Sequence, residues 1–158
     1  MCRDDHDSDK FSSLAICIKN NIEVLHQEFF PTLSDVKFMI TCHSNAVQEN
    51  LSFLLVYRKN NSNILQFVNR IAYLLRTHAI DVVFGDLNIN YFNNKDTHPL
   101  TSLMRSLNYV QIVNRPTFIS GSLLDHVYTK QENKAYVHGS VISVYYSHHD
   151  AIRITIQI

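Results

Sequence analysis

The sequence predicts a mixed α/β domain, an α+β arrangement in which layers of sheet and helix pack against one another. Three observations predict this fold class. Short apolar runs bounded by turn residues recur along the chain, which is typical of strands. Two other segments repeat their apolar residues at helical spacing. No linker, internal repeat or low-complexity tract divides the 158 residues, and this length suffices for one domain with a substantial core.

The first third of the chain is expected to begin with a tail and to continue with strands. Residues 1–10 are polar and acid-rich, which predicts a disordered tail before a domain that covers residues 11–158. Residues 19–21 predict a turn, and short turns between strands indicate an antiparallel or mixed sheet. The expected strands are residues 14–18, which we expect to be buried on both faces, 36–40 and 51–57.

The middle of the chain predicts a helix followed by a buried strand. Ser62 is a suitable N-cap, and the helix is expected to run to about His78. Residues 80–84, which are apolar apart from Asp81, follow and predict the central strand. The apolar face of the helix consists of Ile64, Phe67, Val68, Ile71, Leu74 and Leu75.

The last third predicts a second, shorter helix and several more strands. Residues 91–97 are rich in asparagine and are expected to form a loop. The helix is predicted by the spacing of Leu100, Leu103, Met104 and Leu107. The expected strands are residues 110–113, 124–129, 137–145 and 152–158, the last with isoleucine at every second position.

Composition narrows the classes of function. The formal net charge is zero, whereas nucleic-acid-binding proteins usually carry a basic excess. This balance counts against tight DNA binding but not against a nuclease with a small groove, and nine histidines add positive charge in mildly acidic conditions. Three cysteines without a Cys-x-x-Cys spacing predict free thiols in a reducing compartment.

The sequence also lacks the features of a membrane or exported protein. No apolar run is long enough to span a bilayer, and the acidic first ten residues are unlike a signal peptide. We therefore expect an intracellular protein with no membrane partner. No exposed apolar stripe in the sequence allows a protein partner to be inferred.

Polar residues that suit phosphate chemistry follow the expected central strand. The apolar run ends at Gly85, and Asp86 and Asn88 are two residues apart, so both point to the same side of an extended segment. One carboxylate and one amide are together able to hold a divalent metal and a phosphate oxygen. Alone, a Gly-Asp pair is more often a simple turn at the end of a strand.

Two further motifs follow in order, one at Asp125-His126 and one at Ser147-His148-His149. Each also has a simple structural interpretation, the first as hydrogen-bonded strand residues and the second as a surface turn or an incidental metal site. In this order, the three motifs resemble those of the endonuclease/exonuclease/phosphatase family. Its members are metal-dependent phosphodiesterases and include pancreatic deoxyribonuclease.

In detail, the motifs resemble those of endonuclease domains from non-LTR retrotransposons. The resemblance runs from about Leu14 to the end of the chain and corresponds to the C-terminal two thirds of a family domain, so we expect an N-terminally truncated domain. It implies a four-layer α/β/β/α sandwich, incomplete at the N-terminus. The segments that match are Tyr57-Arg58 and residues 85–88, 116–118 and 125–128.

The resemblance implies a role for each matched residue in phosphodiester hydrolysis. His149 acts at the scissile phosphate, and Asp125 orients and polarises its ring. Asp86 holds or activates the attacking water and binds the metal, Mg²⁺ or Mn²⁺. Asn88 positions Asp86 and contacts the phosphate. Two further substrate contacts are expected, from Tyr57, which counts among the catalytic residues, and from Ser147.

Three departures from the family pattern bear on activity. The family also binds metal through a glutamate in an N-terminal segment that has no counterpart here. His148 occupies the metal-ligand position where the family has aspartate, and an imidazole does not supply the negative charge of a carboxylate. Phe118 stands where the retrotransposon-type proteins usually have arginine, which removes a cation near the substrate.

These observations leave two principal hypotheses for function. The first is a metal-dependent phosphodiester hydrolase, a retrotransposon-type endonuclease that acts on nucleic acid, on DNA rather than RNA. The second is a catalytically inactive, truncated remnant of such a domain that has lost its Mg²⁺ or Mn²⁺. A third hypothesis is a partner-binding module on the same scaffold, and no feature of the sequence supports it.

Overall fold

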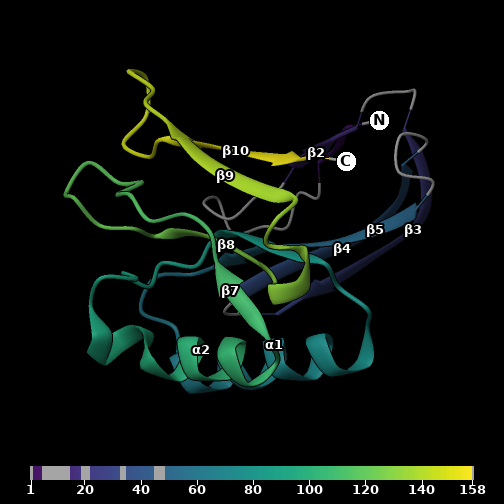
Figure 1. Cartoon of the computed structure of the whole chain (residues 1–158). Helices are drawn as coiled ribbons and strands as arrows, with labels where there is room; N and C mark the ends of the chain where they lie inside the picture. Colours follow the sequence, from purple (N-terminus) through teal and green to yellow (C-terminus); the bar gives the residue numbers. More distant parts are fainter. Residues whose placement is uncertain (1, 5–14, 19–21, 33–34, 45–48, 158) are drawn as a thin grey trace.

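The fold is built on a six-stranded sheet that has two helices on one face and a pair of strands over the other (Figure 1). The structure is a computed structural model and describes residues 2–4, 15–18, 22–32, 35–44 and 49–157. The mixed α/β sandwich that the sequence predicts is thereby confirmed.

The main sheet has the strand order β3-β4-β5-β6-β8-β7. Strands β5 and β6 are parallel because helix α1 connects them as a crossover, and all other neighbours in this sheet are antiparallel. The expectation of a mixed sheet is therefore confirmed. The strands are β3 (Glu23–Pro31), β4 (Asp35–Ser44), β5 (Glu49–Arg58), β6 (Val82–Asp86), β7 (Tyr109–Gln111) and β8 (Asp125–Lys130).

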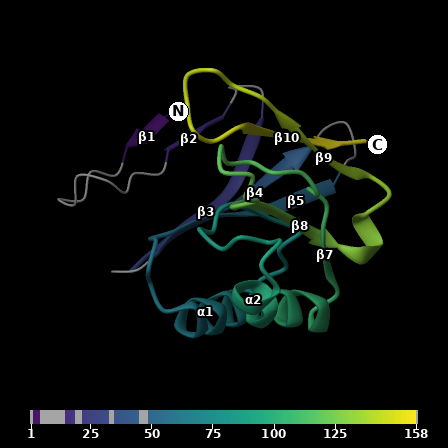
Figure 2. The same ribbon diagram turned by 90° about the vertical axis from the view of Figure 1, so that its left-hand side faces the viewer.

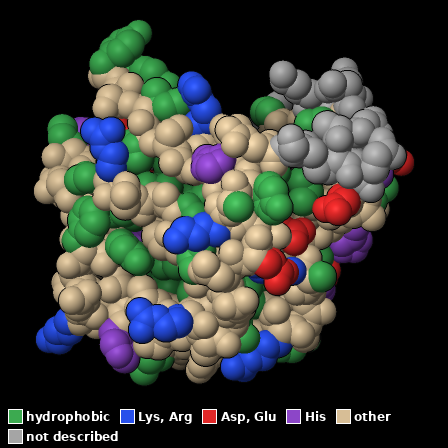
Figure 3. Space-filling model, in the orientation of Figure 1, with side chains coloured by type: hydrophobic (Ala, Val, Ile, Leu, Met, Phe, Trp, Pro, Cys, Tyr) green, Lys and Arg blue, Asp and Glu red, His purple; other side chains and the backbone are tan. Residues whose placement is uncertain are grey.

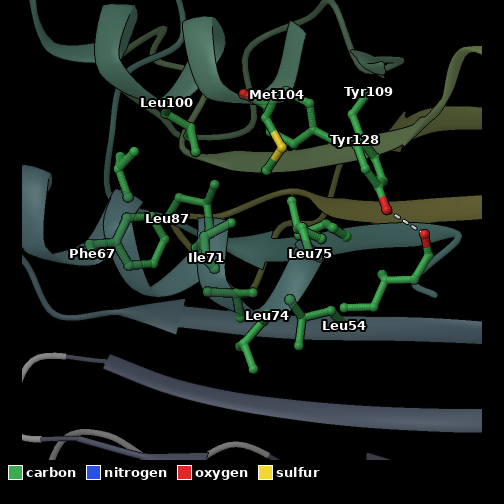
Figure 4. Packing of buried hydrophobic residues seen from close by; sticks show 14 of the residues in the cluster. Leu54, Phe67, Ile71, Leu74, Leu75, Leu87, Leu100, Met104, Tyr109 and Tyr128 are labelled. Carbon is green, nitrogen blue, oxygen red and sulfur yellow. Dashed lines mark hydrogen bonds between the residues drawn. The ribbon is translucent and has the colours of Figure 1, made fainter. Parts of the chain in front are cut away.

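Helices α1 (Ile64–Thr77) and α2 (Asn94–Ser106) lie side by side beneath this sheet (Figure 2). Their apolar faces and one face of the sheet form the larger core cluster, and burying large side chains there supplies most of the stabilisation. The cluster is seen from close by in Figure 4, which labels Leu54, Phe67, Ile71, Leu74, Leu75, Leu87, Leu100, Met104, Tyr109 and Tyr128.

The opposite face of the sheet is covered by the antiparallel pair β9 (Val137–Ile142) and β10 (Ala151–Ile156). Of the four layers that the sequence led us to expect, the described residues form three: helices, main sheet and this pair. A second pair, β1 (Cys2–Asp4) with β2 (Ala15–Cys17), is also antiparallel. A short 3-10 helix, Gln131–Asn133, follows β8.

A smaller apolar cluster lies between β9–β10 and the main sheet, and a cavity of about 430 Å³ remains beside it. The side chains of β10 that face this cavity are only half-buried, so this side of the sheet is packed less completely than the helix side. The cavity is lined by Phe53, Phe84, Gly85, Asp125, Val127, Asp150, Ile152, Ile154 and Ile156.

One strand of the main sheet was not predicted. Strand β3 lies at the edge of the sheet, and its residues from Glu23 to Glu28 are all exposed. An edge strand that is exposed over most of its length has little need of alternating apolar residues, so the periodicity that identifies other strands is missing there.

Both helices begin differently from the prediction. The N-cap of α1 is Asn63, whose side chain accepts a hydrogen bond from the amide of Gln66. Ser62, the expected cap, instead accepts a hydrogen bond from Arg58. Helix α2 begins at Asn94 with Asn93 as its cap, so the expected loop over residues 91–97 is wrong from Asn94 onward. Asparagine is a good N-cap as well as a turn former, and composition alone does not separate the two.

The strand expected at residues 14–18 is β2, but Cys17 is exposed, so burial on both faces is wrong at this residue. Residues 14 and 19–21 lie outside the described residues, as does most of the expected tail, apart from Cys2–Asp4 in β1. Neither helix of the described chain has the length and apolar character that crossing a bilayer requires.

Candidate active site

The candidate site begins at the end of β6, where Gly85 brings the strand unusually close to β5. Its φ angle is +135°, and a Cβ atom placed there would lie 2.0 Å from the carbonyl oxygen of Val56. Only glycine is compatible with both the angle and the approach. The glycine of the Gly-Asp motif is therefore required by the packing of β6 against β5. Asp86 follows it as the last residue of β6.

Asp86 is held by the residue two positions later. Its carboxylate accepts hydrogen bonds from the backbone amide of Asn88, at 2.9 Å, and from the Asn88 side chain, at 3.3 Å. Asn88 has a φ of +47°, a left-handed conformation that asparagine tolerates better than most residues. These contacts are the ones through which Asn88 would position Asp86.

Arg58 is a further residue that supports the site. Its buried guanidinium donates hydrogen bonds to the backbone carbonyl groups of Leu87, at 2.6 Å, and Asn88, at 2.7 Å. The turn after Asp86 is thus fixed from β5 as well as from within. No role is predicted for Arg58 from the sequence, because a lone arginine after a strand reveals nothing of its burial.

Asp125 lies directly opposite Asp86 in the antiparallel pairing of β6 with β8. Paired residues in an antiparallel ladder point to the same face, so the two carboxylates lie side by side. The start of β8 is fixed by Thr117, whose buried hydroxyl accepts hydrogen bonds from the amides of Leu124 and Asp125, both at 3.1 Å.

His149 reaches the same place from the loop between β9 and β10. Its Nδ1 lies 2.9 Å from Oδ2 of Asp125. A carboxylate only accepts hydrogen bonds, so Nδ1 carries the proton, and Nε2 is the ring nitrogen left for other chemistry. The loop is attached to the segment before β8 by a bridge between His149 and Phe118 and by a 2.8 Å hydrogen bond from the Asp150 amide to the Thr117 carbonyl.

Asp86, Asp125 and His149 together form a possible metal site, because their ligand atoms all lie within 4.8 Å of one another. Burial raises the pKa of Asp86, and the charge of Asp125 adds to this effect, while the amide of Asn88, His149 and Arg58 oppose it. Two carboxylates whose negative charges disfavour one another fit a divalent cation, since a cation would offset their repulsion.

The other predicted site residues lie outside this cluster. Ser147 is exposed, and its hydroxyl accepts a 3.0 Å hydrogen bond from the His149 amide, so it supports the loop. His148 is exposed and packs edge-on against Phe118, with ring centroids 6.4 Å apart. Tyr57 is half-buried on β5, and it is not a partner in the hydrogen bonds that hold Asp86 and His149 in the described chain.

Comparison with solved structures identifies the fold. The chain superposes on the endonuclease domain of TRAS1, a telomere-specific non-LTR retrotransposon, with a TM-score of 0.72 and 15% identity over 92% of this chain and 71% of that one. It also resembles a Bacteroides thetaiotaomicron protein of the endonuclease/exonuclease/phosphatase family, with a TM-score of 0.62 and 10% identity over 90% and 66% of the two chains. This chain has the endonuclease/exonuclease/phosphatase fold.

A third solved structure with this fold is a humanized D. rerio TDP2, which superposes with a TM-score of 0.67 and 11% identity over 100% of this chain and 76% of that one. No protein-family model matches the sequence, and no curated protein matches it significantly. At these identities the similarity establishes the deoxyribonuclease I-like fold, and the chemistry has to be argued from the site.

Proposed function

We propose that this chain is a metal-dependent phosphodiester hydrolase, a retrotransposon-type endonuclease that acts on DNA. One observation carries the proposal: Asp86, Asp125 and His149 come from three separate segments and converge within 4.8 Å on a fold that an endonuclease domain shares. Clustered carboxylates with an oriented imidazole suit the hydrolysis of phosphate esters.

Each residue of the site has a role in this proposal. The Nε2 atom of His149 faces the scissile phosphate, and Asp125 holds the ring in the tautomer that leaves Nε2 able to accept or return a proton. Asp86 orients the attacking water, and Asn88 keeps Asp86 in place. A contact from Asn88 to the phosphate remains part of the proposal. Tyr57 and Ser147 remain proposed contacts to the substrate.

The proposed metal is Mg²⁺ or Mn²⁺, held chiefly by the carboxylates of Asp86 and Asp125. Because Nδ1 of His149 already donates to Asp125, the oxygen atoms are the better ligands, and hard cations prefer them. When bound, the cation would stabilise the negative charge that develops on the phosphoryl oxygens.

A second candidate function, an inactive remnant of an endonuclease, is favoured by the composition of the site. His148 is exposed and outside the cluster, and among the described residues only two carboxylates belong to it. Loss of a metal ligand usually reduces the rate by orders of magnitude. We also propose an intracellular location, since the half-buried Cys42 forms no disulfide in the described chain.

The two candidates are separated by nicking of supercoiled plasmid and by cleavage of single-stranded DNA, each with Mg²⁺ and with EDTA. We compare the chain with His149→Ala and with a matched control, His138→Ala, which changes an exposed histidine on β9. Nicking that requires both Mg²⁺ and His149 supports the hydrolase. A folded chain that does not nick DNA overturns present-day nuclease activity on it and supports the remnant, and His148→Asp then tests whether the missing carboxylate is the cause.

A further inference from the structure

The loop between β9 and β10 carries two tyrosines that protrude into solvent. The side chain of Tyr145 is 100% exposed and that of Tyr146 is 77% exposed. Their rings contact each other edge to face, with centroids 5.4 Å apart. Figure 3 shows hydrophobic side chains projecting at the upper left, where Figure 1 places this loop. Two adjacent aromatic side chains so far from any core need an explanation other than folding.

The loop that carries these tyrosines is firmly attached to the domain. The amide of Val144 donates a 3.1 Å hydrogen bond to the Asp150 carboxylate, which closes the loop on itself. The amide of Ile119 donates a 3.0 Å hydrogen bond to the carbonyl of His148. The two rings are therefore presented from a fixed base, so little conformational entropy would be lost when a ligand binds to them.

The loop also connects the tyrosines to the candidate active site. Val144 and Ser147, which flank the pair in sequence, line a cavity of about 420 Å³ together with Phe118 and His148. The Phe118 ring lies 4.8 Å from the ring of His149. The loop that carries the two tyrosines thus also lines a cavity with Phe118, whose ring contacts the histidine at which the proposed reaction takes place.

The lining of this cavity offers no cation for the recognition of phosphates. No lysine or arginine lines the cavity, whose charged member is Asp150, and the net charge of the chain is zero. Stacking of bases on aromatic rings is a further source of affinity for single strands, and it requires no charge on the protein. Bases inside a duplex are stacked on one another, so their faces are available only where the strand is unpaired.

We propose that Tyr145 and Tyr146 form a stacking platform for unpaired nucleobases next to the scissile phosphate, so that the substrate is single-stranded nucleic acid. This inference rests on the proposed function, because it specifies the substrate of the same site. It also accounts for the neutral composition, which is unfavourable for holding a duplex by its phosphates.

Fluorescence anisotropy in EDTA tests the platform without any cleavage. The probes are a labelled DNA strand of about twelve nucleotides, the same strand in a blunt duplex, and the equivalent RNA strand. The variants are Tyr145→Ala/Tyr146→Ala and Tyr145→Phe/Tyr146→Phe. The matched control is Tyr73→Ala, since Tyr73 is 66% exposed on α1, on the far side of the main sheet.

We expect single strands to bind roughly tenfold more tightly than the duplex, and the double alanine variant to lose about tenfold for single strands only. The phenylalanine variant and Tyr73→Ala should bind like the unchanged chain. Stronger binding of the RNA strand with the same dependence on the two tyrosines supports the platform and assigns RNA as its ligand. Equal binding of duplex and single strand, or unchanged binding by the double alanine variant, overturns it.

The failure of this inference is distinct from the failure of the proposed function. A chain that binds single strands through the two tyrosines but cleaves neither strand form with Mg²⁺ retains the platform and loses the hydrolase. A chain that cleaves duplex and single strand equally well, with no effect of the double alanine variant, retains the hydrolase and loses the platform.

Discussion

Arg58 and Asn88 hold each other by reciprocal hydrogen bonds. The Arg58 guanidinium donates to the Asn88 carbonyl at 2.7 Å, and the Asn88 side chain donates to the Arg58 carbonyl at 2.7 Å. The end of β5 is thereby tied to the turn that follows β6. Because the same Asn88 amide group also lies 3.3 Å from Asp86, the candidate site is positioned through contacts that reach into the core.

The first prediction concerns Arg58→Lys. A lysine ammonium is a compact point charge and cannot reproduce the fork that contacts both Leu87 and Asn88, so two backbone carbonyls lose a donor. We expect the free energy of unfolding to fall by about 2 kcal/mol in urea denaturation. The control is Arg153→Lys, an exposed residue on β10, which should change little. Equal stability of the two variants would show that these contacts are dispensable.

The second prediction separates two reasons for glycine at position 85. In Gly85→Ala the new methyl group meets the backbone of Val56, which cannot move aside like a side chain, and the φ of +135° is also unfavourable. We expect a loss of roughly 3 kcal/mol or more, or failure to fold. Gly121→Ala is the matched comparison, since its φ is +83° but nothing lies within 4 Å, so it should cost about 1 kcal/mol. Similar losses for both would exclude the close approach as the cause.

The third prediction is a loss of stability in acid that arises from His126. Its ring is buried between the Ile89 carbonyl, 2.8 Å from Nε2, and the Tyr128 hydroxyl, 3.1 Å from Nδ1, so both nitrogens are satisfied in the neutral form. Burial lowers the pKa of His126 from 6.5 to about 4. Below pH 6.5 the unfolded chain therefore binds a proton that the folded chain does not, and stability falls as the pH falls toward 4.

The contribution of the neutral His126 ring to the free energy of unfolding is fully present above pH 6.5. It should decline by about 3 kcal/mol by pH 4. Urea denaturation across this range measures the total change, and NMR titration of the His126 ring in the folded chain isolates the group. His98→Gln, at an exposed position on α2, should leave the pH profile unchanged. If the His126 ring titrates near pH 6.5 in the folded chain, the prediction is contradicted.

The fourth prediction concerns metal binding and needs no catalytic activity. If Asp86 and Asp125 hold the cation, Mg²⁺ or Mn²⁺ at ten times its Kd stabilises the folded state by about 1.4 kcal/mol, or roughly 3–5 °C in Tm. EDTA should reverse the shift. Asp125→Asn should abolish it, whereas Glu132→Gln, which changes an exposed carboxylate, should not. A shift that persists in Asp125→Asn would place the cation elsewhere.

The parts of the fold that the sequence predicts well are those with one buried face. Helix α1 repeats its apolar residues at the helical period because one side packs on the sheet, and its end at Thr77 lies one residue from the expected limit. Strand β6 is apolar because helices and β9–β10 cover its two faces. Strand β3 has no such requirement, and its sequence therefore carries no comparable pattern.

The candidate site was predictable where residues act through their own side chains. The sequence motifs indicated four site residues, and the structure brings these together: Asp86, Asn88, Asp125 and His149. Thr117 and Arg58 were missed as supports because they act through hydrogen bonds to backbone groups beyond their own segments. Such contacts depend on tertiary structure, which leaves no local pattern of residues to detect.

The register of β8 against β6 determines which residues of β8 face the candidate site and which face the core. It therefore limits the insertions and deletions that this strand tolerates. Asp125 faces the candidate site, and the next residue, His126, is buried on the helix side of the sheet. An insertion or deletion of one residue within β8 would exchange these two faces, placing a carboxylate in the core and an imidazole at the surface. Variants with a one-residue insertion or deletion in this strand should therefore fail to fold. A library of such variants should contain no molecules that are folded but inactive.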